Sequence, residues 1–371
     1  MKNVKEYINE ALRIKSGMKI SAKGFTFVPE TFYELVEFIC KKKDESKNSD
    51  TLDLSLVDCS QISTLENLFG LDRIGFLNPR LSSNIKRIDV TGWNVSKIKN
   101  FNAVFSGCEY VEEIIGVENW DMSSAENINA MFCDCKKLKE LDLSKWNMPN
   151  LGKHQQIGWS GKGFYEVFKG CMSLEKLKGY EKWNLSEYDY MSSVFKFCEK
   201  LKYIDISKWQ LKQGKEQYIN DLFLNCKELE RVNVSNIVTK TFEKTVGVFK
   251  NCINLTEIIG LDTWDMENVF QTSELFKNCS SIVSLDALEQ WELNKLTYAN
   301  EMFAGCHSLE TIGDISHWDI KKLVEMSRMF NGCKKLASDL SSWTIEKRHT
   351  KVNFPFTDTN KKIFKKPNII A

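Results

Sequence analysis

The chain has 371 residues, of which 42% are apolar and 27% are charged, a composition typical of a folded protein in water. Its 51 basic and 50 acidic residues give a net charge of +1, so nothing points to nucleic acid or an anionic membrane as partner. No stretch of 18 apolar residues occurs, and the first residues lack the apolar centre of a signal peptide. We therefore expect a cytoplasmic protein without membrane insertion. The alternative is that an export signal was removed.

Residues 1–50 are predicted to form an α-rich N-terminal cap. Apolar residues three to four apart in 4–14 and 29–43 indicate two amphipathic helices, and 25–28 indicates a short strand. A repeat array needs such a cap, because its first coil would otherwise expose apolar core and an unpaired strand edge. The alternative is that this segment is an independent partner-binding module.

A Phe-x-x-Cys motif recurs through residues 51–345 with a period of about 27 residues. In most copies a Trp lies 12 residues before the Phe, and in one copy Ile237 takes the place of the Trp. Self-similarity at a fixed period is the signature of a solenoid, whose units bury their apolar faces only against their neighbours. The motifs begin at Phe105, Phe132, Phe168, Phe195, Phe223, Phe249, Phe276, Phe303 and Phe330.

Each unit consists of short pieces with different patterns. Asp or Asn followed by Ser comes after the Trp, as in 120–123, which suits a turn. Apolar residues in 125–132 have helical spacing, and the Gly or Asn usually found before the Cys permits the left-handed backbone that ends a helix. Alternating apolar residues in 138–143 predict a strand, and the extra residue in 255–261 predicts a bulge.

These pieces predict an α/β fold. It is a leucine-rich-repeat-like solenoid of about ten coils, with a parallel β-sheet on one face and short helices on the other. We expect the N-terminal cap in 1–50, the solenoid in 51–345, and a C-terminal cap and tail in 346–371. The segments Phe354-Pro355-Phe356 and Ile363-Phe364 are expected to close the last coil.

The 12 cysteines are predicted to be buried packing residues, because most of them occupy one position of the repeat. One thiol per coil suits a reduced ladder better than a disulfide framework. A zinc site needs clustered ligands, and the chain has four histidines and only one close cysteine pair, Cys133 and Cys135. We predict no metal and no cofactor, with redox or disulfide chemistry as the alternative.

About ten extra residues, inserted within 147–163, interrupt the period between Trp146 and Phe168. Insertions in solenoids emerge on one face, often the binding face, and exposed aromatic side chains are typical anchors of interfaces. The insertion holds the tryptophan that falls outside the repeat. Its candidate binding residues are Lys153, His154, Gln155, Gln156, Trp159 and Lys162. The alternative is a tolerated loop whose Trp packs back on the body.

The repeat resembles that of the BspA-like leucine-rich-repeat proteins, in a Trp-Asp/Asn-apolar-Ser corner, a Met-Phe-x-x-Cys piece and a Leu-x-x-Leu-Asp-Leu-Ser strand. The likeness is clearest in 131–146 and extends over about 50–345. It implies a non-enzymatic binding protein, bacterial or phage-encoded. Because the sequence shows no export signal or anchor, surface display is less expected than the resemblance alone suggests.

No sequence motif for catalysis occurs, and the histidines fall in different phases of the repeat. We predict a monomeric, non-enzymatic scaffold that binds a protein of unknown identity, without nucleic acid. The alternatives are a surface-displayed or virion-associated adhesin-like protein that binds host protein or glycan, and self-association through an imperfectly capped sheet edge.

Overall fold

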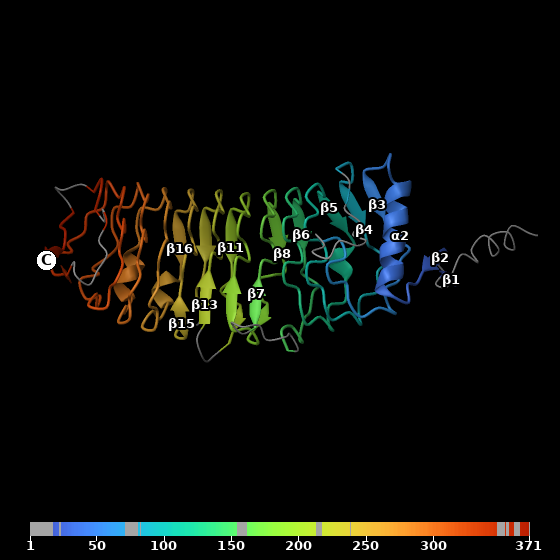
Figure 1. Ribbon diagram of the computed structural model, residues 1–371, viewed down its shortest axis with the longest axis horizontal. Coiled ribbons are helices and arrows are strands. Elements are labelled where there is room, and N and C mark those ends of the chain that lie inside the picture. Colours follow the sequence, from blue (N-terminus) through green and yellow to red (C-terminus); the bar gives the residue numbers. More distant parts are fainter. Residues whose placement is uncertain are drawn as a thin grey trace, which may run out of the picture.

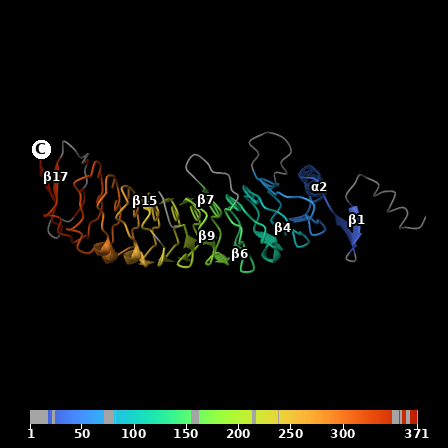
Figure 2. The ribbon, with the colours of Figure 1, turned by 90° about the horizontal axis from the view of Figure 1, so that it is seen from below.

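The chain folds into a β-solenoid of about nine turns, as the computed structural model shows. The structure describes residues 18–21, 24–70, 81, 83–153, 162–212, 217–237, 239–346, 353, 356–359 and 364–370. The coils stack along one long axis, with helix α2 near one end and the C-terminus at the other (Figure 1). Figure 2 shows that the stack curves gently along its length. The predicted solenoid with parallel sheet is confirmed.

Helix α2 (Phe32–Glu45) covers the first coil. Its N-cap is Thr31, whose side chain accepts a hydrogen bond from the backbone of Glu34, which gives the first turn a partner for one free N–H. The helix buries Leu35, Val36 and Ile39 in the main core. This is the amphipathic helix predicted in 29–43. A hairpin precedes it, β1 (Met18–Ser21) antiparallel to β2 (Gly24–Phe27), and the other predicted helix, in 4–14, lies outside the described residues.

One stack of parallel strands uses the piece that follows each Cys. We call its outward side the charged face. It is paired in three separate groups, β3-β4-β5, β6-β8 and β11-β14-β16, and isolated bridges continue it from Ser284 to Thr311 and from Asp339 to Lys365. The strands are β3 (Thr51–Asp53), β4 (Arg87–Asp89), β5 (Glu113–Ile115), β6 (Glu140–Asp142), β8 (Lys176–Lys178), β11 (Tyr203–Asp205), β14 (Arg231–Asn233) and β16 (Glu257–Ile259).

A second parallel stack precedes each Phe, where the sequence predicted only helix. Its strands β7, β10, β13 and β15 form one sheet, and isolated bridges extend the same row from Thr64 through Asn127 at one end and from Lys244 to Glu325 at the other. The strands are β7 (Gly163–Tyr165), β10 (Tyr190–Ser192), β13 (Gln217–Asn220) and β15 (Phe242–Lys244). Short β9 (Asn184–Leu185) pairs with β12 (Gln210–Leu211), and β17 (Thr344–Glu346) pairs with β18 (Asn368–Ile370).

The prediction of short helices opposite the sheet is wrong. Around each Phe the chain makes successive turns, because two residues four apart adopt left-handed backbone, such as Ala130 with φ 52° and Asp134 with φ 57°. An α-helix cannot continue through such residues. The backbone N–H of Phe132 instead donates to Val167 O in the next coil, at 2.9 Å. Some backbone N–H groups thus bond to the next coil, while others close turns within their own coil, as Cys133 N–H does by donating to Ala130 O at 3.0 Å. Among the described residues α2 is the one α-helix.

The left-handed position before each Cys is confirmed in all nine motifs. Gly, Asn and Asp hold most of these positions, since they tolerate a positive φ at low cost. Phe197 adopts it too, with φ 63°, although its bulk is poorly suited to it. The packing of its neighbours therefore imposes the conformation on that coil.

The core is a set of ladders that run along the stack. Phe249 is buried, and its ring lies 5.6 Å from Phe223 and 5.6 Å from Phe276, both nearly parallel to it. The indole rings stack likewise, and the Nε1–H of Trp146 donates to Val117 O in the previous coil at 2.9 Å. Each coil thus contributes an apolar layer. Some indole N–H groups also reach the neighbouring coil, whereas those of four other tryptophans have no hydrogen-bond partner: Trp120, Trp183, Trp318 and Trp343.

The thiols form a ladder of their own. In eight coils the Cys Sγ lies 3.1 Å from the carbonyl oxygen of the Phe in the preceding coil, as a weak S–H donor would. All the cysteines of the repeat are buried, as predicted. A side chain that is small, apolar and able to donate one hydrogen bond fits this position, and this explains why Cys recurs there.

Gaps in the charged-face stack follow a feature of the sequence. In five coils Trp follows Cys by 12 residues instead of 10 or 11. One of them, which ends at Trp291, still pairs with the next coil through Ser284 and Thr311. In the other four a glycine of positive φ ends the strand: Gly116, Gly179, Gly260 and Gly313. A Cβ on Gly179 would lie 2.1 Å from the carbonyl carbon of Leu143, so this backbone leans on the coil before it. Within the described part of the chain no strand pairing joins such a coil to the next one. The bulge predicted in 255–261 is not observed, because β16 pairs with β14 in regular register. The extra residue is accommodated at Gly260, after the strand has ended.

The last coil is closed by aromatic side chains from the C-terminal segment. Phe356 and Phe364 are buried, with ring centroids 5.9 Å and 5.4 Å from that of Phe330. The division into cap, solenoid and tail at 50 and 345 stays a prediction.

Candidate functional site

The predicted binding insertion, 147–163, is described at its two ends only. His154, Gln155, Gln156 and Trp159 lie outside the described residues. Before them, Met148 and Leu151 are buried in the core, and exposed Lys153 donates from Nζ to Asn150 Oδ1 at 3.1 Å. After them, Lys162 leads directly into β7. The insertion therefore emerges where the second stack of strands begins.

Lys162 holds the base of the insertion together. Its Nζ lies 3.1 Å from Gly152 O and 3.2 Å from Lys153 O, so it joins the end of the insertion to its start. Its backbone N–H donates to Asp189 Oδ2 at 2.7 Å. Of the candidate residues the structure describes, Lys153 is accessible and Lys162 is a positioning residue.

Asp189 links this base to a second irregular coil. The other oxygen of its carboxylate accepts a hydrogen bond from Lys212 Nζ, just before the undescribed residues 213–216. Burial alone would raise the pKa of Asp189, but the hydrogen bonds from Lys212 and from the backbone of Lys162 outweigh it and hold that pKa below its usual value. One ionised carboxylate therefore fixes the edges of two interruptions of the repeat.

Between these two interruptions, the strands carry stacked tyrosines. Tyr190 on β10 pairs with Tyr218 on β13, and their ring centroids are 4.7 Å apart with the planes 12° from parallel. On the other side Tyr190 faces Gly163 of β7, where a Cβ would come within 2.2 Å of the ring. A glycine in this row is thus required for the tyrosine to lie flat, and the half-buried rings present mainly their edges and hydroxyl groups.

The row that contains these tyrosines has two charged side chains, Lys244 and Glu325, among its ten described positions. The row lies five residues before each Phe. We define the tyrosine face as the side chains of this row together with the outward side chains two residues further along the chain. The row consists of Thr64, Asn100, Asn127, Gly163, Tyr190, Tyr218, Lys244, Gln271, Tyr298 and Glu325. Tyr, Asn, Gln and Ser are the side chains that protein-binding surfaces use for adaptable contacts.

The charged face is different, because its charges are paired between its own coils. Arg231 pairs with Glu257, Lys139 with Glu112, and Lys176 with Glu140. Lys202 Nζ also lies 3.6 Å from Glu230 Oε1. A partner that displaced these contacts would have to desolvate both charges of each pair, which makes the charged face a poor surface for docking.

The thiols have no reactive environment. Burial raises the pKa of the Cys133 thiol to about 12, with the nearby Asp134 carboxylate contributing, and burial raises the pKa of Cys171 far above the usual range. A thiolate, the reactive form, is therefore disfavoured in these coils. Across the described ranges, no three His, Cys, Asp or Glu side chains are grouped so that they could hold a metal ion.

A known sequence family matches the chain in three overlapping copies, at residues 76–165, 162–260 and 246–366. The family is described as "Mycoplasma protein of unknown function, DUF285". The chain belongs to the DUF285 family. Each family copy spans three to four coils, so the family is defined by the repeat itself. The comparison with curated proteins found no match.

Among solved structures, the chain is similar to bacterial leucine-rich-repeat proteins. One from Bacteroides ovatus is 19% identical over 85% of this chain and 77% of that one, with a TM-score of 0.42. One from Eubacterium ventriosum is 12% identical over 94% of each chain, with a TM-score of 0.34. A leucine-rich cell surface protein from Faecalibacterium prausnitzii is 13% identical over 84% and 83%, with a TM-score of 0.27. The finer resemblance to BspA-like proteins stays a prediction.

In the described ranges, none of the helices is long and apolar enough to span a bilayer.

The tyrosine face was missed from the sequence, although a signal for it exists. The sequence predicts a helix in 125–132 and its equivalents. A helix gives no reason to compare the position five residues before each Phe from one coil to the next. Reading that one position down the repeat gives Tyr three times and Asn twice in ten coils. The surface is not evident from the sequence because the predicted helical backbone is wrong, although the side chains at this position are distinctive.

Proposed function

We propose that this DUF285 protein is a non-catalytic scaffold that binds a protein partner through the tyrosine face and the insertion 147–163. The proposal keeps the candidate residues Lys153, His154, Gln155, Gln156 and Trp159 as contacts, and gives Lys162 the task of holding the insertion in place. It includes action in the cytoplasm as a monomer. Display on a cell surface or virion, with host protein or glycan as the ligand, is the competing function.

The stacked pair Tyr190–Tyr218 beside the base of the insertion carries this proposal. It supplies large, rigid contact area at little cost in side-chain entropy, because each ring is already held by its neighbour. The surrounding Asn and Ser side chains can donate and accept without a charge to desolvate. The charged face lacks these properties, since its charges are engaged with one another.

The experiment is affinity capture from lysate of the native source, with wild type and three variants compared in parallel. The first variant is Trp159→Ala with Lys153→Ala and His154→Ala, which removes the insertion contacts. The second is Tyr218→Ala, which removes half of the stacked pair. The third, Arg231→Ala on the charged face, is the matched control, because it also truncates a large outward side chain of a parallel strand.

The expected result is a protein retained by wild type and by Arg231→Ala, and lost or weakened at least tenfold in both other variants. Circular dichroism and thermal unfolding of each variant would separate lost binding from lost folding. If every variant captures the same protein, or only Arg231→Ala loses it, the assignment of the face is wrong. If wild type captures no protein but binds a glycan array or intact cells, the adhesin-like function replaces the proposal.

A further inference from the structure

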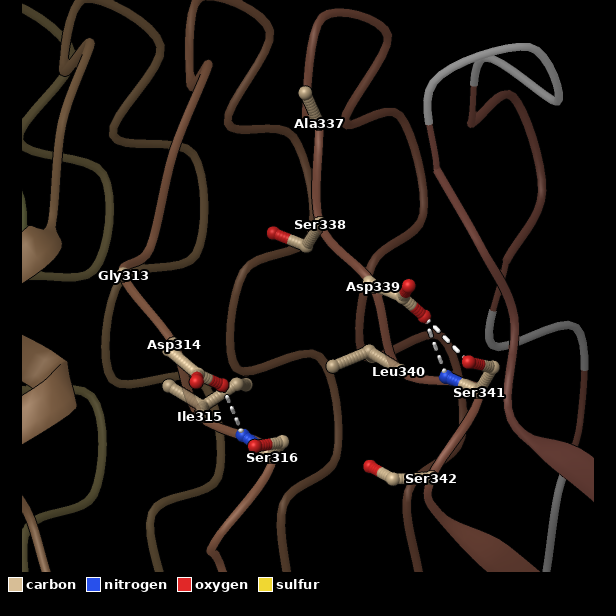
Figure 3. A pocket seen from close by; sticks show the side chains of 10 residues that line it. All are labelled: Gly313, Asp314, Ile315, Ser316, Ala337, Ser338, Asp339, Leu340, Ser341 and Ser342. Carbon is tan, nitrogen blue, oxygen red and sulfur yellow. Dashed lines mark hydrogen bonds between the residues drawn. The ribbon is translucent and has the colours of Figure 1, made fainter.

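A wedge-shaped groove opens on the charged-face side near the C-terminal end, where the strand of Thr311 and that of Asp339 separate (Figure 3). Its volume is about 450 Å³. At the closed end the backbone N–H of Ala337 donates to Glu310 O at 2.9 Å. Beyond this bond, no backbone hydrogen bond joins 313–316 to 338–342 in the described structure. The groove is lined by Gly313, Asp314, Ile315, Ser316, Ser338 and Asp339, among others.

The two coils stay in contact beneath the groove. The Trp318 and Trp343 rings are 6.2 Å apart, and the Phe303 and Phe330 rings are 5.3 Å apart, which are the spacings of the other coils. Only the outer strands diverge, and this follows from the extra residue at Gly313, whose left-handed backbone turns the chain toward Asp286. The groove is therefore confined to the outer strands, and the core beneath it is continuous.

The Asp339 wall exposes main-chain groups to this gap. The N–H of Leu340 and the carbonyl of Ser338 bond to Lys365 in the following coil, so the alternation of a strand directs the N–H and carbonyl of Asp339 toward the groove. On the opposite wall, the left-handed backbone of Gly313 interrupts the strand alternation after Thr311, and the Asp314 side chain lines the groove. Neither Asp314 nor Asp339 has a backbone partner across the gap.

Side chains add to this unmet hydrogen-bonding capacity. Ser338 is 9% exposed, its Oγ has no hydrogen-bond partner, and Figure 3 shows the hydroxyl directed toward the wall of Gly313 and Ile315. A buried hydroxyl without a partner costs free energy unless something binds it. The Asp314 carboxylate accepts only from Ser316 N, at 3.0 Å, and no lysine or arginine of the described chain pairs with it.

An equivalent gap elsewhere in the chain is filled by the protein itself. Between β8 and β11, Tyr180 occupies the place of Ile315, and its phenol oxygen accepts a hydrogen bond from the N–H of Asp205 at 3.0 Å. Asp205 is the counterpart of Asp339. The gap between β5 and β6 is lined instead by long charged side chains such as Lys139 and Glu140. In the wedge, the buried Ile315 side chain has no hydrogen-bonding group to take the place of the Tyr180 phenol, so the main chain of Asp339 remains available.

We propose that this groove binds an extended peptide segment bearing a lysine or arginine, which adds as a strand along the Asp339 wall. The N–H and carbonyl of Asp339 bond the peptide backbone, and the Asp314 carboxylate receives the basic side chain. The site lies on the other stack from the tyrosine face, and it does not depend on the function proposed for that face.

The test is a titration of the full-length, ¹⁵N-labelled protein with the capped peptide acetyl-Thr-Val-Lys-Val-Thr-amide, followed by amide resonances. Saturable shifts are expected at Asp314 and Asp339. Two further peptides dissect the contact: one is N-methylated at both valines, which blocks main-chain donors and should bind at least tenfold more weakly. The other has Glu in place of Lys and should also lose affinity.

Variants of the protein complete the test. Ile315→Tyr introduces the phenol that Tyr180 supplies in its own coil, and it should abolish peptide binding by filling the groove. If that variant fails to fold, Ser338→Ala serves instead, with a smaller expected loss. The control is Ser235→Ala, beside β14, which pairs with a strand on each side. Absence of saturable shifts in wild type, equal binding of the N-methylated peptide, or shifts confined to the tyrosine face would each overturn the proposal.

Discussion

Two parallel stacks of strands rest on one core, and they differ in what they present to solvent. The charged face displays lysines, arginines and glutamates whose partners lie one coil away, as Arg231 and Glu257 do. The tyrosine face displays Tyr, Asn and Gln, with Tyr190 and Tyr218 stacked on each other. The backbone geometry of the two stacks is nearly the same, so side chains alone make the difference.

The comparison shows how a repeat protein can divide its surfaces. Ion pairs between coils set the register of the charged face and oppose wrong pairings, but exposed pairs of this kind contribute little stability each. The described positions of the tyrosine face lack such pairing along most of its length. Paired charges are thus concentrated on one side and uncharged, adaptable contact area on the other.

The largest expected effect belongs to the core that both faces share. Phe249→Ala should lower the free energy of unfolding by about 3–5 kcal/mol, because the ring is fully buried between two others and leaves a cavity. Urea unfolding followed by tryptophan fluorescence would measure it. Phe249→Leu is the control, and a comparable loss in that variant would show that shape rather than cavity volume decides the cost.

A matched pair of tyrosines sharpens the contrast between the faces. Tyr190→Ala should cost about 1–2 kcal/mol through lost stacking and lost apolar contact with its neighbours. Tyr203→Ala, on the charged face, should cost only about 0.5 kcal/mol, because that ring is 48% exposed and contacts mainly the Arg231 guanidinium, 5.7 Å from its centroid. Equal losses in urea unfolding would remove the energetic distinction between the two faces.

Charge reversal tests whether the charged face is held by its pairs. Arg231→Glu places a carboxylate opposite Glu257 and should cost up to about 1 kcal/mol at low salt. Because salt screens exposed charges, the cost should shrink in molar sodium chloride. Thermal unfolding at two salt concentrations would measure both values, and a loss that is independent of salt would mean that packing, not charge, is responsible.

The smallest expected effect is a pH dependence at Asp189. Its pKa is lower in the folded chain than its ordinary value of 3.8, so its ionised form stabilises the fold above that pH, and this contribution is lost as the pH falls through the folded pKa. Asp189→Asn should therefore be less stable than wild type at neutral pH. The difference should narrow as the pH falls toward 3. Urea unfolding across that range checks this, and a difference that widens in acid would contradict it.

Much of the fold could be predicted from the sequence, because the repeat reports the same environment many times. Phe249 and its equivalents recur in phase with Trp and Cys, and a position that is apolar in every coil must face the shared core. The turn after each Trp was equally readable: Asp121 Oδ1 accepts from Ser123 N at 3.0 Å, as the residue types indicate. The left-handed residue before each Cys followed from the same reasoning.

What could not be predicted depends on contacts between coils. The segment 125–132 has the spacing of a helix, but its backbone bonds to the next coil, and a single coil's sequence contains no sign of that partner. The stacked tyrosines remained hidden for the same reason. Four of the six candidate binding residues lie in 154–161, outside the described residues, so the insertion site stays a prediction, while Lys162 is placed at its base.

The ladder of buried thiols allows the unfolding of individual coils to be followed by thiol alkylation. Each repeat coil carries a cysteine that an alkylating reagent cannot reach until that coil opens, because burial also suppresses the thiolate. If the solenoid melts from its ends inward, a brief pulse of reagent during denaturation would mark only the outermost coils. Mass spectrometry of the marked peptides would then give the position of the melting boundary along the chain, one coil at a time.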